Sequence, residues 1–365
     1  MSDPTPDTRS ALEQVQSHLA THASLVSSQL VGCDLRGLQA TQCHFEDVDF
    51  SGCLLEGAQL EGSVFERCVF NQAQLVAANL SKTQWQSCQM NQVQLAQTQA
   101  DSIALYQCSL RQAGIGTAHW TRATLDGCDL AGTDFSGSDL SLSDFSQCNL
   151  QGTRFAQTLM HRWTAVKADL RTAIFDKANL TLAFLTEADL SGQHLSSCDL
   201  TMANFTGANL QGACLGSAVL PQAQFRECNL QRADLRRAQG IYVRFDGANL
   251  QQAQLGSAVL EAASFAQANC AGADMSKMQC IQGNFEFCLL TGAQLSQALL
   301  TDSNFSHANL SGSNCSHADF SGANFHRITD TGTCWDGSLR KGVRDTHEQL
   351  RAAEDWRSPL HSQTA

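Results

Sequence analysis

An apolar residue recurs at nearly every fifth position of this chain, and this period of five restricts the possible folds more than any other feature. Between Leu30 and Phe325, Leu or Phe fills 47 of the 60 positions whose number is a multiple of five. Two positions earlier in each unit, 54 of 60 residues are Ala, Cys, Ser, Thr or Val. A helix repeats its faces every 3.6 residues and a strand every 2.0, so neither element keeps this pattern inside a protein.

A chain that turns a corner after each five residues does keep the pattern. Four such units close one square coil, and residues twenty apart then lie directly above one another. The bulky residue and the small residue of each unit point inward, and the residue between them, commonly Asp, Asn or Gln, points outward. Gly often precedes the small residue, as at Gly132 and Gly207, where a corner favours it.

Columns of identical residues twenty apart support a coil of this length. One column holds only phenylalanine: Phe205, Phe225, Phe245, Phe265, Phe285, Phe305 and Phe325. Another holds only cysteine: Cys68, Cys88, Cys108, Cys128 and Cys148. Such columns are expected to form ladders of stacked side chains.

The repeated unit, seen clearly from Ala203 to Leu210, resembles the A(D/N)LXX consensus of the pentapeptide repeat family. The resemblance covers residues 30–325 and implies an all-β solenoid, a right-handed quadrilateral parallel β-helix of about 15 coils. At about 4.8 Å per coil the solenoid would be roughly 70 Å long. Short terminal helices are expected to cap it.

The predicted organisation has three parts. They are an N-terminal segment with a capping helix (1–24), the β-helix (25–329), and a C-terminal cap with a short helix and a disordered tail (330–365). Exposed β edges pair with other chains unless they are covered, so capping is the expected role of both ends. A homodimer formed through the C-terminal segment is the sharper alternative, because some members of the family dimerise end to end.

Each terminal helix is predicted from a local pattern. Residues 8–22 place Leu12, Val15 and Leu19 on one side of an amphipathic helix. Asp345 to Trp356 form the second predicted helix, in which Thr346 and Gln349 have the spacing of a capping box.

The sixteen cysteines are predicted to be packing residues. Eleven occupy the small inward position, three the bulky one, and only Cys214 and Cys334 fall outside both classes. Free cysteine behaves as a small apolar residue and is often buried. We therefore expect free thiols and a reducing, cytoplasmic compartment, with export by a signal-peptide-independent secretion system as an option.

Neither catalysis nor a cofactor is predicted. The chain has no P-loop, no H-E-x-x-H motif and no nucleophile elbow. His307 and His326 should be neighbours on adjacent coils, but two ligands do not make a zinc site. The first 25 residues contain no apolar run long enough for a signal peptide or a membrane span. Direct nucleic-acid binding is not expected.

Deviations from the repeat are the candidate sites. Three units exchange the large and the small residue and so conserve core volume: Leu38 with Ala40, Trp163 with Ala165, and Met278 with Cys280. Two units, Thr98 to Ala100 and Ala238 to Gly240, have no such exchange and are interpreted as uncompensated.

The second uncompensated unit is followed by an aromatic residue among arginines, a composition typical of interface hot spots. The predicted protein-binding site comprises Gln239, Ile241, Tyr242, Arg232, Arg236, Arg237 and Arg244. A solvated face beside a locally thinned core is the alternative interpretation.

Two functions follow from these observations and the resemblance. The favoured one is a non-catalytic scaffold that binds a protein partner. One form of this role is an effector or accessory protein of a bacterial secretion system. The resemblance also implies an alternative, a DNA mimic that protects DNA gyrase or topoisomerase IV from fluoroquinolones. Residues 25–329 hold 17 Lys and Arg against 26 Asp and Glu. Duplex DNA of the same length carries about 40 charges, so the net charge favours the scaffold.

Overall fold

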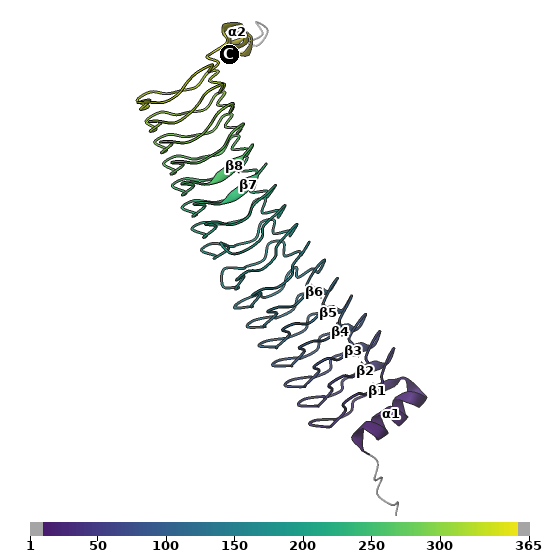
Figure 1. The fold of residues 1–365 in the computed structure, drawn as a ribbon. Coiled ribbons are helices and arrows are strands. Elements are labelled where there is room, and N and C mark those ends of the chain that lie inside the picture. The colour runs from purple at the N-terminus through teal and green to yellow at the C-terminus, as the bar shows by residue number, and fades with distance from the viewer. Residues whose placement is uncertain (1–9, 357–365) are drawn as a thin grey trace, which may run out of the picture. The chain divides into compact units, whose positions relative to one another are not determined.

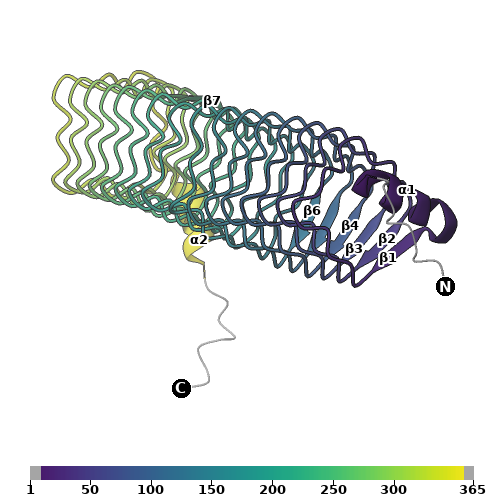
Figure 2. The ribbon, with the colours of Figure 1, turned by 90° about the horizontal axis from the view of Figure 1, so that it is seen from below.

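The computed structural model describes residues 10–356, which fall into two compact units. Unit 1 ends at Asn204 and unit 2 begins at Phe205. Within each unit the chain winds into stacked coils of similar outline (Figure 1 and Figure 2). The predicted class, a quadrilateral parallel β-solenoid with two short helices, is confirmed.

Regular elements are short and most of each coil is held by isolated bridges. Unit 1 contains α1 (Ala11–His22), β1 (Ser24–Val26), β2 (His44–Glu46), β3 (Val64–Glu66), β4 (Gln84–Gln86), β5 (Ala104–Tyr106) and β6 (Thr124–Asp126). Unit 2 contains β7 (Gln239–Ile241), β8 (Val259–Glu261) and α2 (Glu348–Asp355). The strands β1 to β6 form one parallel sheet in sequence order, and β7 pairs with β8.

Every strand pair and every bridge joins residues twenty apart. Leu25 lies beside Phe45 in the first coil, and Asn324 lies beside Arg344 in the last. The number of turns differs slightly from the predicted 15. Pairing begins at Ser24 and continues past residue 329 to Arg344.

The geometry of the corners explains why Gly and Asp or Asn recur at fixed positions of the repeat. At a typical corner the Cys33 N–H donates to the Leu30 carbonyl at 3.0 Å, and Gly32 between them has φ +69°. This is the geometry of a type II turn, whose third residue needs a positive φ. The outward acidic residue caps the corner, as Asp134 does by accepting a 2.9 Å hydrogen bond from the Ser136 N–H.

The core is a set of stacked inward side chains. In the phenylalanine column of unit 2 the ring centroids of Phe205 and Phe225 lie 5.0 Å apart, and the two rings are 1° from parallel. Successive rings remain nearly parallel as far as Phe305. The last ring, Phe325, stands at 90° to its neighbour.

The three predicted volume exchanges are buried pairs: Leu38 with Ala40, Trp163 with Ala165, and Met278 with Cys280. All sixteen cysteines are free thiols.

The prediction that two units lack compensating core volume is wrong. In both cases an inward side chain of the following unit fills the space. A Cβ built on Gly240 would lie 2.6 Å from Cγ2 of Val243, so the valine already occupies that space. In the first unit, buried Ile103 holds the equivalent position after Ala100. Trp120 also packs in the same column, and its indole N–H donates to Thr98 Oγ1 at 3.0 Å.

At the N-terminal end, α1 satisfies the open edge of the first coil. Its Gln16 side chain donates to the Gln39 carbonyl at 2.6 Å and accepts from the Gln39 N–H at 3.1 Å, as a preceding strand would. Val15 and Leu19 are buried beneath it, and Ser10 with Glu13 forms a capping box. Residues 8 and 9, included in the predicted helix, lie outside the described residues.

The C-terminal helix differs from its prediction. Its N-cap is His347, whose Nδ1 accepts from the Leu350 N–H at 3.2 Å, so the proposed capping box of Thr346 and Gln349 is wrong. Thr346 instead accepts from the Arg327 N–H of the solenoid at 3.0 Å. None of the residues of α2 is buried. The predicted disordered tail beyond residue 356 lies outside the described residues.

The αL corners predict opposite effects for two neighbouring glycines. Gly212 has φ +66° and open space around its Cα, whereas Gly216 has an ordinary φ and only van der Waals neighbours. Gly212→Ala should lower the free energy of unfolding by about 1 kcal/mol, because Ala is strained in this region. Gly216→Ala should be neutral or stabilising by up to about 1 kcal/mol. Denaturant unfolding measures both, and equal effects would contradict the assignment of the corners.

Volume compensation at β7 predicts a coupled pair. Gly240→Ala should cost roughly 1–3 kcal/mol of unfolding free energy, because the new Cβ meets Val243 and the backbone of Leu220. Adding Val243→Ala removes the first clash, so the double variant should be more stable than the sum of the two single effects. Strictly additive unfolding free energies would show that Val243 does not fill this space.

Candidate functional site

The predicted binding residues lie at and around β7 in unit 2. Gln239 and Ile241 point outward from β7, and Tyr242 follows at the corner. The side chains of Ile241 and Tyr242 are 39% and 58% exposed. Because β7 is bridged to Val219 on one side and paired with β8 on the other, its backbone is fixed between two coils.

Three of the arginines differ in what holds their guanidinium groups. Arg236 makes a bidentate contact with Asp234 at 2.9 and 2.7 Å, and this hydrogen bonding lowers the pKa of Asp234. Arg244 is held by Asp246 at 2.9 Å. Within residues 10–356, the Arg237 side chain forms no ion pair or hydrogen bond, although it is exposed. Arg237 is therefore the arginine whose charge is open to a partner.

Arg232 does not lie near the other predicted binding residues. It lies ten residues before Tyr242, which is half of a twenty-residue coil, and so it occupies the opposite corner. Its Nε donates instead to Gln252 at 3.0 Å, one coil further along. The structure thus brings together Gln239, Ile241 and Tyr242, with Arg236 and Arg237 at the preceding corner.

Apolar side chains one to three coils away lie on the same side of the solenoid. Val219 and Leu299 belong to the outward column of Gln239, and Ile281 belongs to that of Ile241. Their exposed fractions are 45%, 41% and 37%. We call the set Val219, Gln239, Ile241, Tyr242, Ile281 and Leu299 the β7 face. The signal that could have identified it is apolar residues at outward positions separated by multiples of twenty.

Unit 1 contains a different feature, a cavity of about 320 Å³ where the ladder between two coils is interrupted. Gln193 stands at a small inward position, and its amide donates to the carbonyl of Ala173 at 3.0 Å. The cavity is also lined by His194, Ser197 and Asp176. Ser197 hydrogen-bonds directly to Asp176 at 3.3 Å, and His194 bonds to neither in the described part of the chain. These three residues therefore do not form a catalytic triad.

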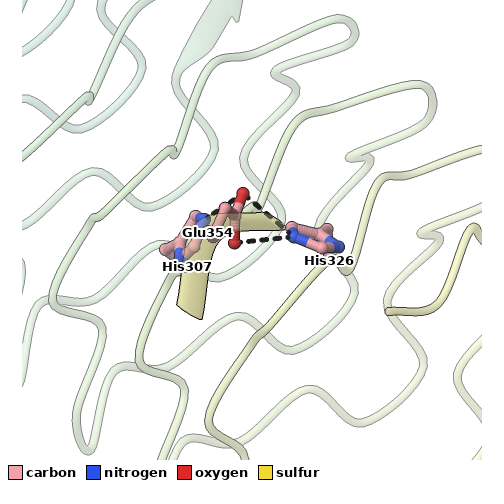
Figure 3. Close-up of side chains that lie close together, drawn as sticks. All are labelled: His307, His326 and Glu354. Carbon is pink, nitrogen blue, oxygen red and sulfur yellow. Dashed lines mark hydrogen bonds and ion pairs between the residues drawn. The ribbon is translucent and has the colours of Figure 1, made fainter. Parts of the chain in front are cut away.

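A polar cluster in unit 2 adds a group that the sequence analysis missed. His307 and His326 are neighbours on adjacent coils, as predicted, but Glu354 of α2 places its carboxylate between them (Figure 3). The carboxylate lies 3.5 Å from His307 Nε2 and 3.2 Å from His326 Nε2. No repeat pattern links residue 354 to the solenoid, so the sequence carried no signal for this contact.

Neither described helix has the length and apolar composition that crossing a bilayer requires. None of the curated proteins matches the chain.

Solved structures similar to this chain include pentapeptide repeat proteins. HetL, a pentapeptide repeat protein involved in heterocyst differentiation regulation in the cyanobacterium Nostoc, is 27% identical over 63% of this chain and 88% of its own, with a TM-score of 0.26. A pentapeptide repeat protein from the thylakoid lumen of Arabidopsis thaliana is 26% identical over 35% of this chain and 75% of its own, with a TM-score of 0.21. QnrB1, a plasmid-mediated fluoroquinolone resistance protein, is 16% identical over 52% of this chain and 91% of its own, with a TM-score of 0.28.

Family models match most of the sequence. The model described as a pentapeptide repeat region matches residues 41–115. The model described as pentapeptide repeats matches residues 118–162, 164–192, 183–220, 203–239, 218–255, 244–277 and 288–327. The chain belongs to the pentapeptide repeat family.

Proposed function

We propose that the protein is a non-catalytic scaffold whose β7 face binds a protein partner. The observation that carries the proposal is the gathering of exposed apolar side chains around Tyr242, beside the unpaired guanidinium of Arg237. Tyr and Arg are the residue types most enriched in interface hot spots. A single exposed apolar residue needs no explanation, but several on one side of the solenoid favour an interaction surface.

The rigidity of β7 supports a binding role. Backbone hydrogen bonds fix it on both sides, as when the Gln239 N–H donates to Ala218 and the Tyr242 N–H donates to Glu261. A fixed surface loses little conformational freedom on association, which leaves more of the contact energy for affinity. The complementary partner presents an apolar surface with a carboxylate placed opposite Arg237.

Charge pairing weighs against the alternative of a DNA mimic. The carboxylates of the solenoid are repeatedly neutralised by a neighbouring guanidinium: Asp34 by Arg36, Asp101 by Arg122, Asp169 by Arg171, Asp234 by Arg236 and Asp246 by Arg244. A surface that imitates a phosphate backbone needs rows of unpaired negative charge. Binding to gyrase is therefore the second candidate.

A second copy of this chain is a further proposed partner, at the C-terminal end of unit 2. The last turn leaves Trp335 half-buried and Leu339 58% exposed, and Arg340 lies 5.1 Å above the Trp335 ring. An uncovered solenoid end of this kind can pair with the same end of another copy.

Site-specific photocrosslinking tests the β7 face. A benzophenone amino acid at Tyr242 should capture one partner protein from the source cells. The control is the same substitution at Gln252, which is exposed at the opposite corner and has the same φ of 58°. We expect capture at position 242 to fall at least tenfold with Ile241→Asp, because a hot-spot contact of about 2 kcal/mol is lost.

Two outcomes would contradict this proposal. Equal capture at positions 242 and 252 would show that the β7 face is not the binding surface. Inhibition of purified gyrase supercoiling by micromolar protein, weakened by added salt, would instead support the DNA mimic.

A further inference from the structure

We propose that His307, His326 and Glu354 form a binding site for a divalent transition-metal ion of the zinc class. Their ligand atoms all lie within 4.8 Å of one another. Two imidazoles and one carboxylate are a common set of protein ligands for zinc, with water completing the tetrahedron. The sequence offered two histidines only, and the structure supplies the third ligand from α2.

The two imidazoles are held in place by the solenoid. His307 and His326 come from adjacent coils, where the His307 N–H donates to the His326 carbonyl at 2.8 Å. The His307 ring stacks on Phe287 at 4.5 Å and 9° from parallel. His326 is only 4% exposed. Both rings are therefore oriented before any ion arrives, which lowers the cost of binding.

Glu354 is the ligand that comes from α2, and its charge is shared with Arg327. Arg327 donates to Glu354 Oε2 at 3.2 Å and to Asp355 at 2.7 Å. Asp355 thus offsets the positive charge of the guanidinium, and Oε1 remains directed at His307. Both carboxylate oxygens thus face imidazole nitrogens, Oε1 toward His307 and Oε2 toward His326.

The hydrogen bonds of His326 show what binding must change. Its Nδ1 accepts from the His347 N–H at 3.1 Å, so the proton of the neutral ring is on Nε2 and points to Glu354. An ion on Nε2 would leave the ring proton on Nδ1, facing the His347 N–H. The His347 peptide must then turn away. Because His347 is exposed and follows the last bridged residue, Arg344, this change can be confined to the start of α2.

There is room beside the cluster for such a change. A cavity of about 260 Å³ is lined by His326, His347, Asp345 and Leu350, among others. It can hold the rearranged His347 peptide. Metal occupancy and the conformation of the α2 N-terminus are therefore coupled.

Titration of the full chain, without a histidine tag, tests the site. Calorimetry with Zn²⁺ should detect one ion per chain, and Co²⁺ should give the visible absorption of a tetrahedral complex. Glu354→Gln and His307→Ala should each weaken Zn²⁺ binding by at least about tenfold. His317→Ala is the matched control, since His317 is an exposed histidine of the same unit, and it should bind Zn²⁺ as the parent does.

Backbone NMR supplies a readout that a purely structural role of Glu354 would not move. Zn²⁺ should shift the amide signal of His347 in the parent and leave it unchanged in Glu354→Gln. Because Glu354 lies on α2, which buries no residue, the metal-free variant should keep the unfolding temperature of the parent. Undiminished Zn²⁺ affinity in Glu354→Gln, equal loss in His317→Ala, or no Zn²⁺ binding by the parent would each overturn the proposal.

Discussion

Backbone hydrogen bonds between residues about twenty apart hold each unit together, and every other feature depends on them. The Asp49 N–H donates to the Ser28 carbonyl, and the Phe50 N–H donates to Val69 in the next coil. The N–H and the carbonyl of each outward residue thus bond to the coil before it, and the inward residues on either side of it bond to the coil after it. This register stacks the phenylalanines, places cysteine thiols beside backbone carbonyls, as Cys68 beside Phe45, and gives a positive φ at nearly every corner. The side chains conform to the ladder, and the five-residue pattern records that constraint.

The five-residue pattern predicted the features that recur in every coil. It did not predict contacts between units or contacts with α2. Coil length, the phenylalanine column and the buried cysteines were all predictable, because each follows from inward positions spaced by five or twenty. The role of Val243 in filling the space at Gly240 was not, because that contact passes around a corner between units. The separation of Arg232 from Tyr242 was missed because the two residues are close in sequence but half a coil apart, on opposite corners. The contact of Glu354 with two histidines arises from a helix outside the repeat.

Functional features occur where the uniform surface becomes uneven. The β7 face combines fixed backbone, exposed apolar side chains and the free charge of Arg237, whereas most other cations of the solenoid are paired with carboxylates. The histidine cluster arises for a different reason, since α2 brings a carboxylate to a pair of imidazoles already aligned by the ladder. Both lie in unit 2, and both use the solenoid as a rigid support for a few side chains.

A coil of twenty residues sets the register within each unit, and a pair of deletions in unit 2 tests this dependence. Removal of residues 249–268 deletes one coil and should leave a single cooperative thermal transition with β-type circular dichroism, because inward and outward positions still match. Removal of residues 249–267 shifts every later residue by one position and should abolish that transition or lower its midpoint strongly. If both deletion variants unfold at the same temperature as the parent, the twenty-residue register does not govern the fold.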